Sequence, residues 1–390
     1  MNRNKWISSL LASLGVTALV AYIIACGSGP AFSPDDSKVL LVASDPGTDG
    51  LGVLVHDRKN GRNDQVFAHC LIGDSGSSDK EQCLLRPMWT PDGRNIVVAW
   101  AGAGSHDDEL NLAVVPLGGR GPTRILGIGG IKDAAKMPLT VAGSSLFVVA
   151  DSNRVARVNL ASGQSATHYC KGQKVHLYPS FDGSVAYYAS ESEQADKSEF
   201  GKLDPVSFAQ TAIMQVAEKD LDPEQCVVAV SRDGKKLALL PREKSNPVLR
   251  LVSAPGTERT LPLGLGDEKV AFGNACFSAQ GDILYAAFAS EQNTNTLSLG
   301  FMAIPLDGKP LRRSVLVSDV GPADKDAVLY FQVDLSHDGK TLAACSSIQA
   351  MFEKSTLKPQ DCALFLVDVS RPEGKVEKIP VPFPRKAKPQ

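Results

Sequence analysis

The stretch "FSPDDSKVLLVAS", residues 32–44, decides the fold. It begins with a polar turn sequence, Ser33 to Ser37, and continues into mostly aliphatic residues that end at Ser44. A short run of Asp, Gly, Pro and Ser next to strand-forming residues favours a tight reversal in which one residue takes a positive φ. The stretch therefore predicts a β-hairpin whose turn lies near Asp36.

The same phrase recurs along the chain at intervals of about 50 residues. The clear copies are "WTPDGRNIVVAWA" (89–101), "SFDGSVAYYAS" (180–190), "VSRDGKKLALLPR" (230–242), "FSAQGDILYAAFA" (277–289) and "LSHDGKTLAACSS" (335–347), and "TVAGSSLFVVA" (140–150) is a degenerate copy. Aligning the copies on the turn residue gives Asp36, Gly93, Gly143, Gly183, Gly234, Gly281 and Gly339. Repeats of this length are typical of propeller blades.

A further strand follows each hairpin at a variable distance and ends in a turn, as in "LNLAVVPLGGRG" and "RVARVNLASGQ", and a fourth strand comes after it. No segment after residue 31 has a sustained helical period. The sequence therefore predicts an all-β chain, with a single seven-bladed β-propeller of four-stranded antiparallel blades over residues 32–384 and a short tail at 385–390. Two stacked β-sandwiches are the alternative, but they leave the repeat unexplained. The innermost strand of each blade is expected to precede the turn, and these segments are mostly apolar.

Residues 1–25 are typical of an export signal, because Arg3 and Lys5 precede an uncharged apolar run from Trp6 to Ala25. The junction "YIIAC" resembles the lipobox of bacterial lipoproteins, which implies cleavage before Cys26 and diacylation of that residue. An uncleaved membrane anchor and an ordinary secretory signal remain open, since the run approaches the roughly 20 apolar residues of a spanning helix. Gly27 rather than Asp at the next position implies the outer membrane under the enterobacterial sorting rule.

Residues 26–31 form the expected tether between the lipid and the propeller. The five residues from Gly27 to Ala31 span at most about 17 Å when fully extended. The propeller is therefore expected to lie close to the bilayer, with one rim or face held toward it.

The charge of the chain gives no reason to expect nucleic acid. After removal of Arg3 and Lys5 with the signal, 39 basic residues remain against 43 acidic ones, a net charge of −4. Binding to nucleic acid relies on basic surfaces that neutralise phosphates, so we expect no such partner.

The Phe-Ser-Pro-Asp-Gly-Lys type of phrase resembles the TolB-like and related WD40-type (PD40) propeller repeats of bacteria over nearly all of residues 32–381. That resemblance implies a propeller, and it leaves function open because such propellers serve as binding platforms and as gating domains of enzymes. The chain departs from TolB in two ways. It has no separate N-terminal domain of the kind that TolB carries, and Cys26 implies a lipid that TolB lacks.

The stretch "AHCLIGDSGSSDKEQC", residues 68–83, contains words familiar from serine proteases. His69 and Ser75 are six residues apart in one predicted connection, whereas a trypsin-like site brings together residues far apart in sequence. The segment Gly73 to Ser77 also lacks the final glycine of a hydrolase nucleophile turn. We therefore expect no catalytic residue here and predict that His69 ends a strand.

Seven cysteines remain after Cys26, so at least one has no partner within the chain. Cys70 and Cys83 bracket the connection between the first two blades, and a disulfide is predicted between them. Cys345 and Cys362 bracket an insertion in the seventh blade and form the second predicted disulfide. Among Cys170, Cys226 and Cys276 the sequence decides no pairing, with a slight preference for Cys170 with Cys226.

No metal and no cofactor is predicted. "SHDDE" (105–109) and "SDPGTDG" (44–50) are rich in possible ligands, but neither has the full spacing of a known calcium loop. Solvated turns are the favoured interpretation, and the scattered histidines have no zinc spacing.

Taken together, these features favour a non-catalytic, lipid-anchored scaffold of the bacterial cell envelope that binds a protein partner or an envelope polymer. Its expected contact surface is made by insertions between the second and third strands of blades, which should all emerge on one side of the disc. These insertions are 45–50, 102–109, 190–200, 290–296 and 346–361. The alternative is a propeller enzyme, of sugar or lactone hydrolase or lyase type, with its site in the central channel.

Overall fold

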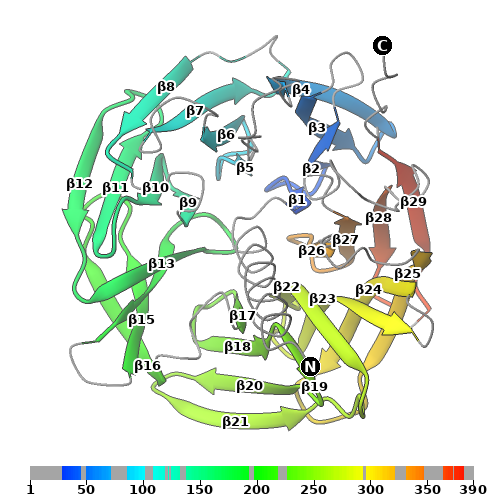
Figure 1. The fold of residues 1–390 in the computed structure, drawn as a ribbon. Helices are drawn as coiled ribbons and strands as arrows, with labels where there is room; N and C mark the ends of the chain where they lie inside the picture. Colours follow the sequence, from blue (N-terminus) through cyan, green and yellow to red (C-terminus); the bar gives the residue numbers. More distant parts are fainter. Residues whose placement is uncertain are drawn as a thin grey trace, which may run out of the picture.

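The described part of the computed structural model is a closed ring of antiparallel sheets around a central channel (Figure 1). It comprises residues 29–44, 50–71, 86–101, 109–118, 122, 124–131, 138–192, 197–217, 226–292, 296–320, 331–346, 363–371 and 373–381. Seven sheets follow one another in chain order, so the prediction of an all-β, seven-bladed β-propeller is confirmed.

Each blade consists of four consecutive strands that run from the channel outward. The first three blades are β1 (Ala31–Phe32), β2 (Lys38–Ser44), β3 (Gly50–Asp57) and β4 (Arg62–Leu71); β5 (Arg86–Trp89), β6 (Asn95–Ala101), β7 (Glu109–Pro116) and β8 (Arg124–Gly129); β9 (Leu139–Ala142), β10 (Ser145–Val149), β11 (Arg154–Asn159) and β12 (Ser165–Tyr169). The fourth and fifth are β13 (Gln173–Pro179), β14 (Ala186–Glu191), β15 (Lys197–Leu203) and β16 (Gln210–Ala217); β17 (Cys226–Val230), β18 (Lys236–Pro241), β20 (Val248–Ser253) and β21 (Thr257–Pro262). The last two are β22 (Lys269–Phe277), β23 (Ile283–Gln292), β24 (Thr296–Pro305) and β25 (Arg312–Val320); β26 (Phe331–Leu335), β27 (Thr341–Ser346), β28 (Ala363–Asp368) and β29 (Val376–Pro380).

One short strand departs from the predicted four-stranded pattern. β19 (Glu243–Ser245) lies between the second and third strands of the fifth blade but pairs with β22, so the sixth sheet has five strands. Three residues are too few to show alternation in a sequence, which is why this strand was not anticipated.

The turn between the first and second strands has the predicted conformation in all seven blades. The seven aligned turn residues have positive φ angles between 56° at Gly143 and 73° at Gly339. In the first blade the Ser33 hydroxyl donates to Asp35 over 2.7 Å and accepts the backbone N–H of Lys38 over 2.9 Å. Such local side-chain to backbone bonds are the reason Ser and Asp favour turns. Because the Ser33 hydroxyl donates to Asp35, the pKa of that carboxyl falls to about 2.

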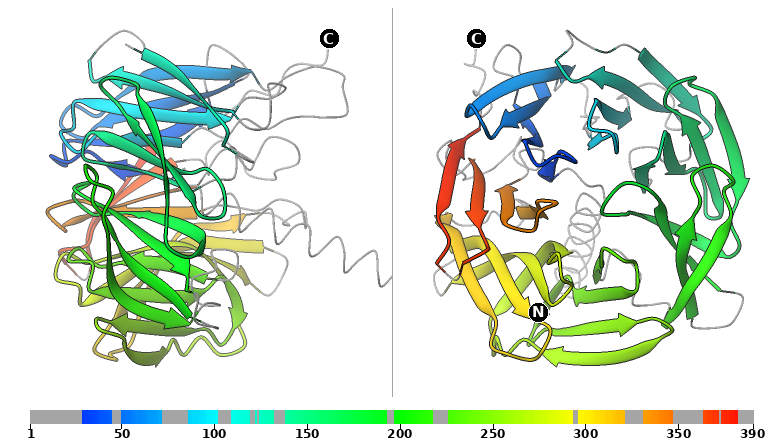
Figure 2. Two further views of the ribbon diagram at one scale, coloured as in Figure 1. Left: turned by 90° about the vertical axis from the view of Figure 1, so that its left-hand side faces the viewer. Right: turned by 180° about the vertical axis from the view of Figure 1, so that it is seen from behind.

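The hydrophobic core lies between neighbouring blades rather than within one of them, and Figure 2 shows the disc edge-on and from behind. The largest cluster joins the first blade to both of its neighbours, with Leu40 and Val53 from the first blade, Trp100 from the second and Leu364 from the seventh. The faces of each sheet are buried against the next sheet, so each blade is stabilised by its neighbours in the ring.

Polar side chains reinforce the junction of the first and last blades. The Arg58 guanidinium donates to the Asp36 carbonyl over 2.7 Å and to the Thr341 hydroxyl over 2.8 Å. Each blade at this junction is made of its own consecutive strands. The ring is therefore closed here by side-chain contacts and not by a strand exchanged between the two ends.

The strand order defines two faces of the disc. Because neighbouring strands are antiparallel, the first-to-second and third-to-fourth turns lie on one side, the turn face. The second-to-third and fourth-to-first connections lie on the other side, the loop face. The five predicted insertions fall between the second and third strands of their blades, β2–β3, β6–β7, β14–β15, β23–β24 and β27–β28, so their ends lie on the loop face as predicted. Two of them are shorter than predicted, because β14 and β15 occupy much of 190–200 and β23 and β24 occupy much of 290–296.

Candidate functional site: the central cavity

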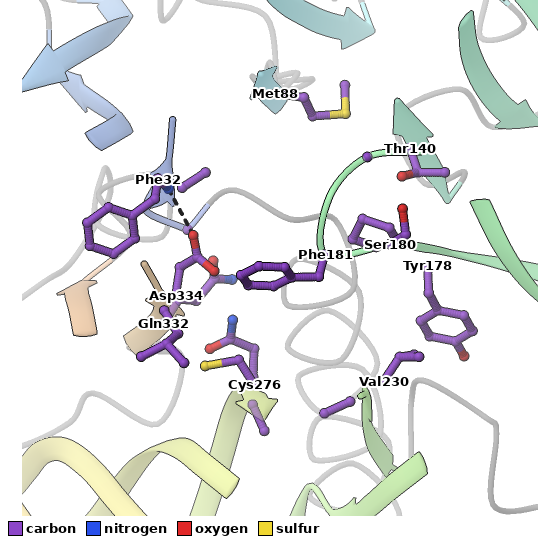
Figure 3. Close-up of a pocket in the computed structure, with 18 of the residues that line it drawn as sticks. Phe32, Met88, Thr140, Tyr178, Ser180, Phe181, Val230, Cys276, Gln332 and Asp334 are labelled. Atoms are coloured by element: carbon purple, nitrogen blue, oxygen red, sulfur yellow. Dashed lines mark hydrogen bonds between the residues drawn. The ribbon is translucent and has the colours of Figure 1, made fainter. Parts of the chain in front are cut away.

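The first strand of every blade lines a central cavity of about 460 Å³ (Figure 3). The lining comes from β1, β5, β9, β13, β17, β22 and β26 and from the turns that follow them. This confirms that the innermost strand precedes the turn. The ring thereby brings together residues that lie far apart in the sequence. Phe32 and Asp334, for example, are 302 positions apart and both line the cavity.

The cavity is more polar than the mostly apolar inner strands indicate. Arg86 is almost completely buried, with 1% of its surface exposed, and it lies on the cavity wall. When the blades are aligned on their turn residues, the position seven residues earlier holds Arg86, His176, Asn274 and Gln332, all of which line the cavity. These four polar side chains form one layer around the cavity. The alignment on the turn residues reveals this layer, whereas each inner strand taken by itself is mostly apolar.

Asp334 is the most perturbed carboxyl group of the cavity wall. Burial raises its pKa from 3.8 to about 6, against the opposing effect of a hydrogen bond from the Phe32 backbone. Burial likewise raises the pKa of the neighbouring Cys276 thiol well above 9.0, and the charge of Asp334 adds to this effect. A carboxyl group that titrates near neutral pH in a cavity is able to exchange protons with a bound molecule.

A cluster of four side chains spans the cavity at the turn face, and we call it the plug: Asp36, Phe181, Arg232 and His337. The Phe181 ring extends from the fourth blade toward the middle of the ring (Figure 3) and lies 4.6 Å, centroid to centroid, from the His337 ring of the seventh blade. The Arg232 guanidinium of the fifth blade also stacks on the Phe181 ring, with its Cζ atom 3.5 Å from the ring centroid. These contacts connect the fourth, fifth and seventh blades across the channel.

Asp36 fixes the end of the plug at the junction of the first and seventh blades. Its carboxylate accepts the backbone N–H of His337 over 2.6 Å and that of Asp338 over 2.8 Å. The His337 Nδ1 lies 3.0 Å from the same carboxylate. Asp36 thereby holds the backbone and the Nδ1 atom of His337, while the imidazole ring packs against the Phe181 ring.

The predicted lipidation and disulfide residues lie largely outside the described residues. Cys26, Ser75, Cys83 and Cys362 belong to undescribed segments, so both predicted disulfides and the predicted lipid anchor stay predictions. His69 and Cys70 lie near the end of β4, which confirms that this segment ends a fourth strand. Cys345 lies on β27 and is buried.

Cys170 is a free, buried thiol that follows β12. Burial raises the pKa of this thiol to about 11. The slight preference for a Cys170–Cys226 pair is therefore wrong. The two residues lie on different layers of the ring, since Cys170 follows an outermost strand and Cys226 begins an innermost one.

Within the described ranges, no group of three or more His, Cys, Asp or Glu side chains is arranged to hold a metal ion. The segments 45–49 and 102–108, which contain most of the candidate calcium ligands, are outside those ranges. The same ranges contain no helix of the length and apolar character needed to cross a membrane.

Comparisons with known proteins establish the class of fold. No protein-family model matches the sequence, and no curated protein matches it. The structure is similar to the complex of KlAtg21 with the coiled coil of AgAtg16, at a TM-score of 0.56 and 15% identity, covering 90% of this chain and 97% of that one. It is also similar to a prolyl endopeptidase structure, at 0.55 and 10% identity, covering 94% of this chain and 52% of that one. TolB from Acinetobacter baumannii is a further match, at 0.41 and 17% identity, covering 72% and 66%.

The first two of these matches place the chain in the structural class of β-propellers. Their sequence identities of 10 and 15% show the fold alone. The class includes binding proteins as well as the propellers of peptidases, so function has to be argued from this chain's own surfaces.

Proposed function

We propose that this protein is a non-catalytic, lipid-anchored β-propeller scaffold of the bacterial cell envelope, anchored in the outer membrane through Cys26. Its loop face binds a protein partner or an envelope polymer. The export signal and the cysteine at its end support the anchor. Nucleic acid is not an expected partner, because the mature chain is acidic.

The observation that carries the binding role is the placement of the insertions. The five second-to-third connections named above begin and end on one face of the disc, and those between β6 and β7 and between β27 and β28 are the longest of them. The opposite face consists of tight turns whose side chains bond to their own backbone, as Ser33, Asp35 and Ser37 do. Variable loops on a rigid scaffold are the usual site of recognition.

Affinity capture with two matched variants tests this role. Lys171 and Lys197 are exposed at the loop-face end of the fourth blade, and Lys235 and Lys340 are exposed on the turn face. We expect a partner captured from detergent-solubilised envelope to be lost with the Lys171→Glu/Lys197→Glu variant and retained with Lys235→Glu/Lys340→Glu. Both variants change the net charge equally. Loss of the partner with the turn-face variant alone would contradict the assignment of the binding face.

A second candidate function is catalysis in the central cavity, favoured by the raised pKa of Asp334. Under this alternative Asp334 serves as a general acid or base toward a sugar or lactone. The discriminating experiment measures bound metal and turnover of such substrates by the purified protein and by Asp334→Asn. Turnover that is abolished by this substitution, with no partner recovered from the envelope, would favour the enzyme over the scaffold.

A further inference from the structure

The chain enters the ring at the loop-face end of the channel. Gly29 packs so closely on Gln332 that a Cβ atom added at residue 29 would lie 2.1 Å from the Gln332 side-chain oxygen. Gln332 is the second residue of β26, near the strand end that is remote from the turn at Gly339. Gly29 and Pro30 both line the cavity. The first described residues are therefore fixed at the channel and not at the rim.

The dimensions of a blade limit where an anchor before Gly29 can lie. Two residues, Gly27 and Ser28, lie between Cys26 and Gly29, so the three Cα–Cα steps reach at most about 10 Å. The turn begins at Ser33, four Cα–Cα steps after Gly29, so the turn face is roughly 13 Å away at about 3.3 Å per step. The fourth strand lies about 14 Å outward from the first, at roughly 4.8 Å per strand. An anchor at Cys26 reaches neither the turn face nor the rim.

We propose that the loop face lies against the lipid bilayer, with the channel end at Gly29 directly over the membrane and the turn face pointing away. This orientation rests on the anchor in the proposed function. It also holds if residues 6–25 are retained as a membrane anchor, because that apolar run ends at Ala25, one residue before Cys26. A partner that binds the loop face is then one embedded in the membrane or lying on its surface.

Exposed lysines on the two faces report the orientation without any substitution. Three lysines lie at the loop-face end of the fourth blade. The Lys171 carbonyl accepts the hydroxyl of Ser190 near the end of β14, Lys174 forms an ion pair with Glu191, and Lys197 begins β15.

The matching set on the turn face directly follows turn glycines and consists of Lys235, Lys309 and Lys340. Lysines of the two sets are exposed to a similar degree. The exposed fraction of the side chain is 67% for Lys174 on the loop face, and 77% for Lys309 and 70% for Lys340 on the turn face. A difference in labelling between the two sets in vesicles therefore reports shielding by the membrane rather than burial in the protein.

The experiment uses the full-length protein, purified from membranes and reconstituted into vesicles of phosphatidylethanolamine and phosphatidylglycerol. A charged, membrane-impermeant acylating reagent labels exposed lysines, and peptide mass spectrometry gives the labelling ratio of the loop-face set to the turn-face set. We expect this ratio to fall several-fold in vesicles relative to the same protein in detergent. A ratio that is unchanged or higher, in protein whose N-terminal peptide carries an anchor, would overturn the orientation.

The N-terminal peptide separates the two possible failures. If its mass shows neither acyl chains on Cys26 nor a retained apolar segment, the anchor is wrong and the orientation is wrong with it. If an anchor is present and the two lysine sets are labelled as they are in detergent, only the orientation is wrong.

Discussion

The backbone N–H of Phe32 donates a hydrogen bond to the Asp334 carboxylate over 2.9 Å, although the two residues are 302 positions apart in the chain. The bond joins the innermost strands of the first and seventh blades. β1 contains only two residues and forms few backbone bonds of its own. Asp334 therefore helps to hold the short first strand in the ring, and the first prediction follows from this contact.

Replacing Asp334 by Ala should destabilise the protein, whereas Asp334→Asn should not. Alanine leaves the buried Phe32 N–H without an acceptor, at a cost of about 1–3 kcal/mol. Asparagine keeps an acceptor oxygen and removes the buried charge. Urea denaturation at neutral pH gives the free energies of unfolding. Equal destabilisation by the two substitutions would argue against this role for the hydrogen bond.

The stability of the wild type should fall relative to Asp334→Asn as the pH rises through about 6. The pKa of Asp334 is higher in the folded protein, about 6, than its ordinary value of 3.8. The folded state therefore binds the proton more tightly, and this stabilisation is complete below pH 3.8 and lost above about pH 6. Unfolding free energies of both proteins across this interval measure the effect. A difference that is independent of pH would contradict the raised pKa.

Gly183→Ala should destabilise the protein more than Gly118→Ala. Both glycines have positive φ angles, 66° and 80°, so both substitutions carry the same backbone cost of about 1–2 kcal/mol. Only at Gly183 would the new Cβ collide with a neighbour, Pro91, at 2.7 Å, since nothing lies within 4 Å at Gly118. Overpacking adds roughly 1–3 kcal/mol. Equal loss of stability, measured by thermal or urea denaturation, would show that the turns of the second and fourth blades separate easily at this contact.

Peptide mapping of the nonreduced, denatured protein should find Cys70 joined to Cys83 and Cys345 joined to Cys362, with Cys170 as a thiol. Closing the loop between Cys70 and Cys83 is worth roughly 3 kcal/mol in the chain-entropy description. Cys83→Ser should therefore lower stability, while Ser75→Ala in the same connection should change neither stability nor function. Recovery of Cys70 or Cys345 as an alkylated thiol would contradict the predicted disulfides.

The repeat made the local structure predictable. An Asp-Gly pair between strand-forming residues specifies a turn with positive φ, and even the degenerate copy at Gly143 follows it. The contacts that shape the cavity could not be predicted in the same way. Phe181 and His337 meet across the ring because the blades close into a circle, and no local pattern relates two residues 156 positions apart. The burial of Arg86 likewise depends on the complete ring.

The mass of the N-terminal peptide of the membrane-extracted protein tests the central claim most directly, because the scaffold is proposed to act from a lipid anchor. We predict that the mature chain begins at Cys26 and that this residue carries a diacylglyceryl group, with residues 1–25 absent. A peptide that contains an unmodified Cys26, whether residues 1–25 are removed upstream or retained, would contradict the lipoprotein assignment.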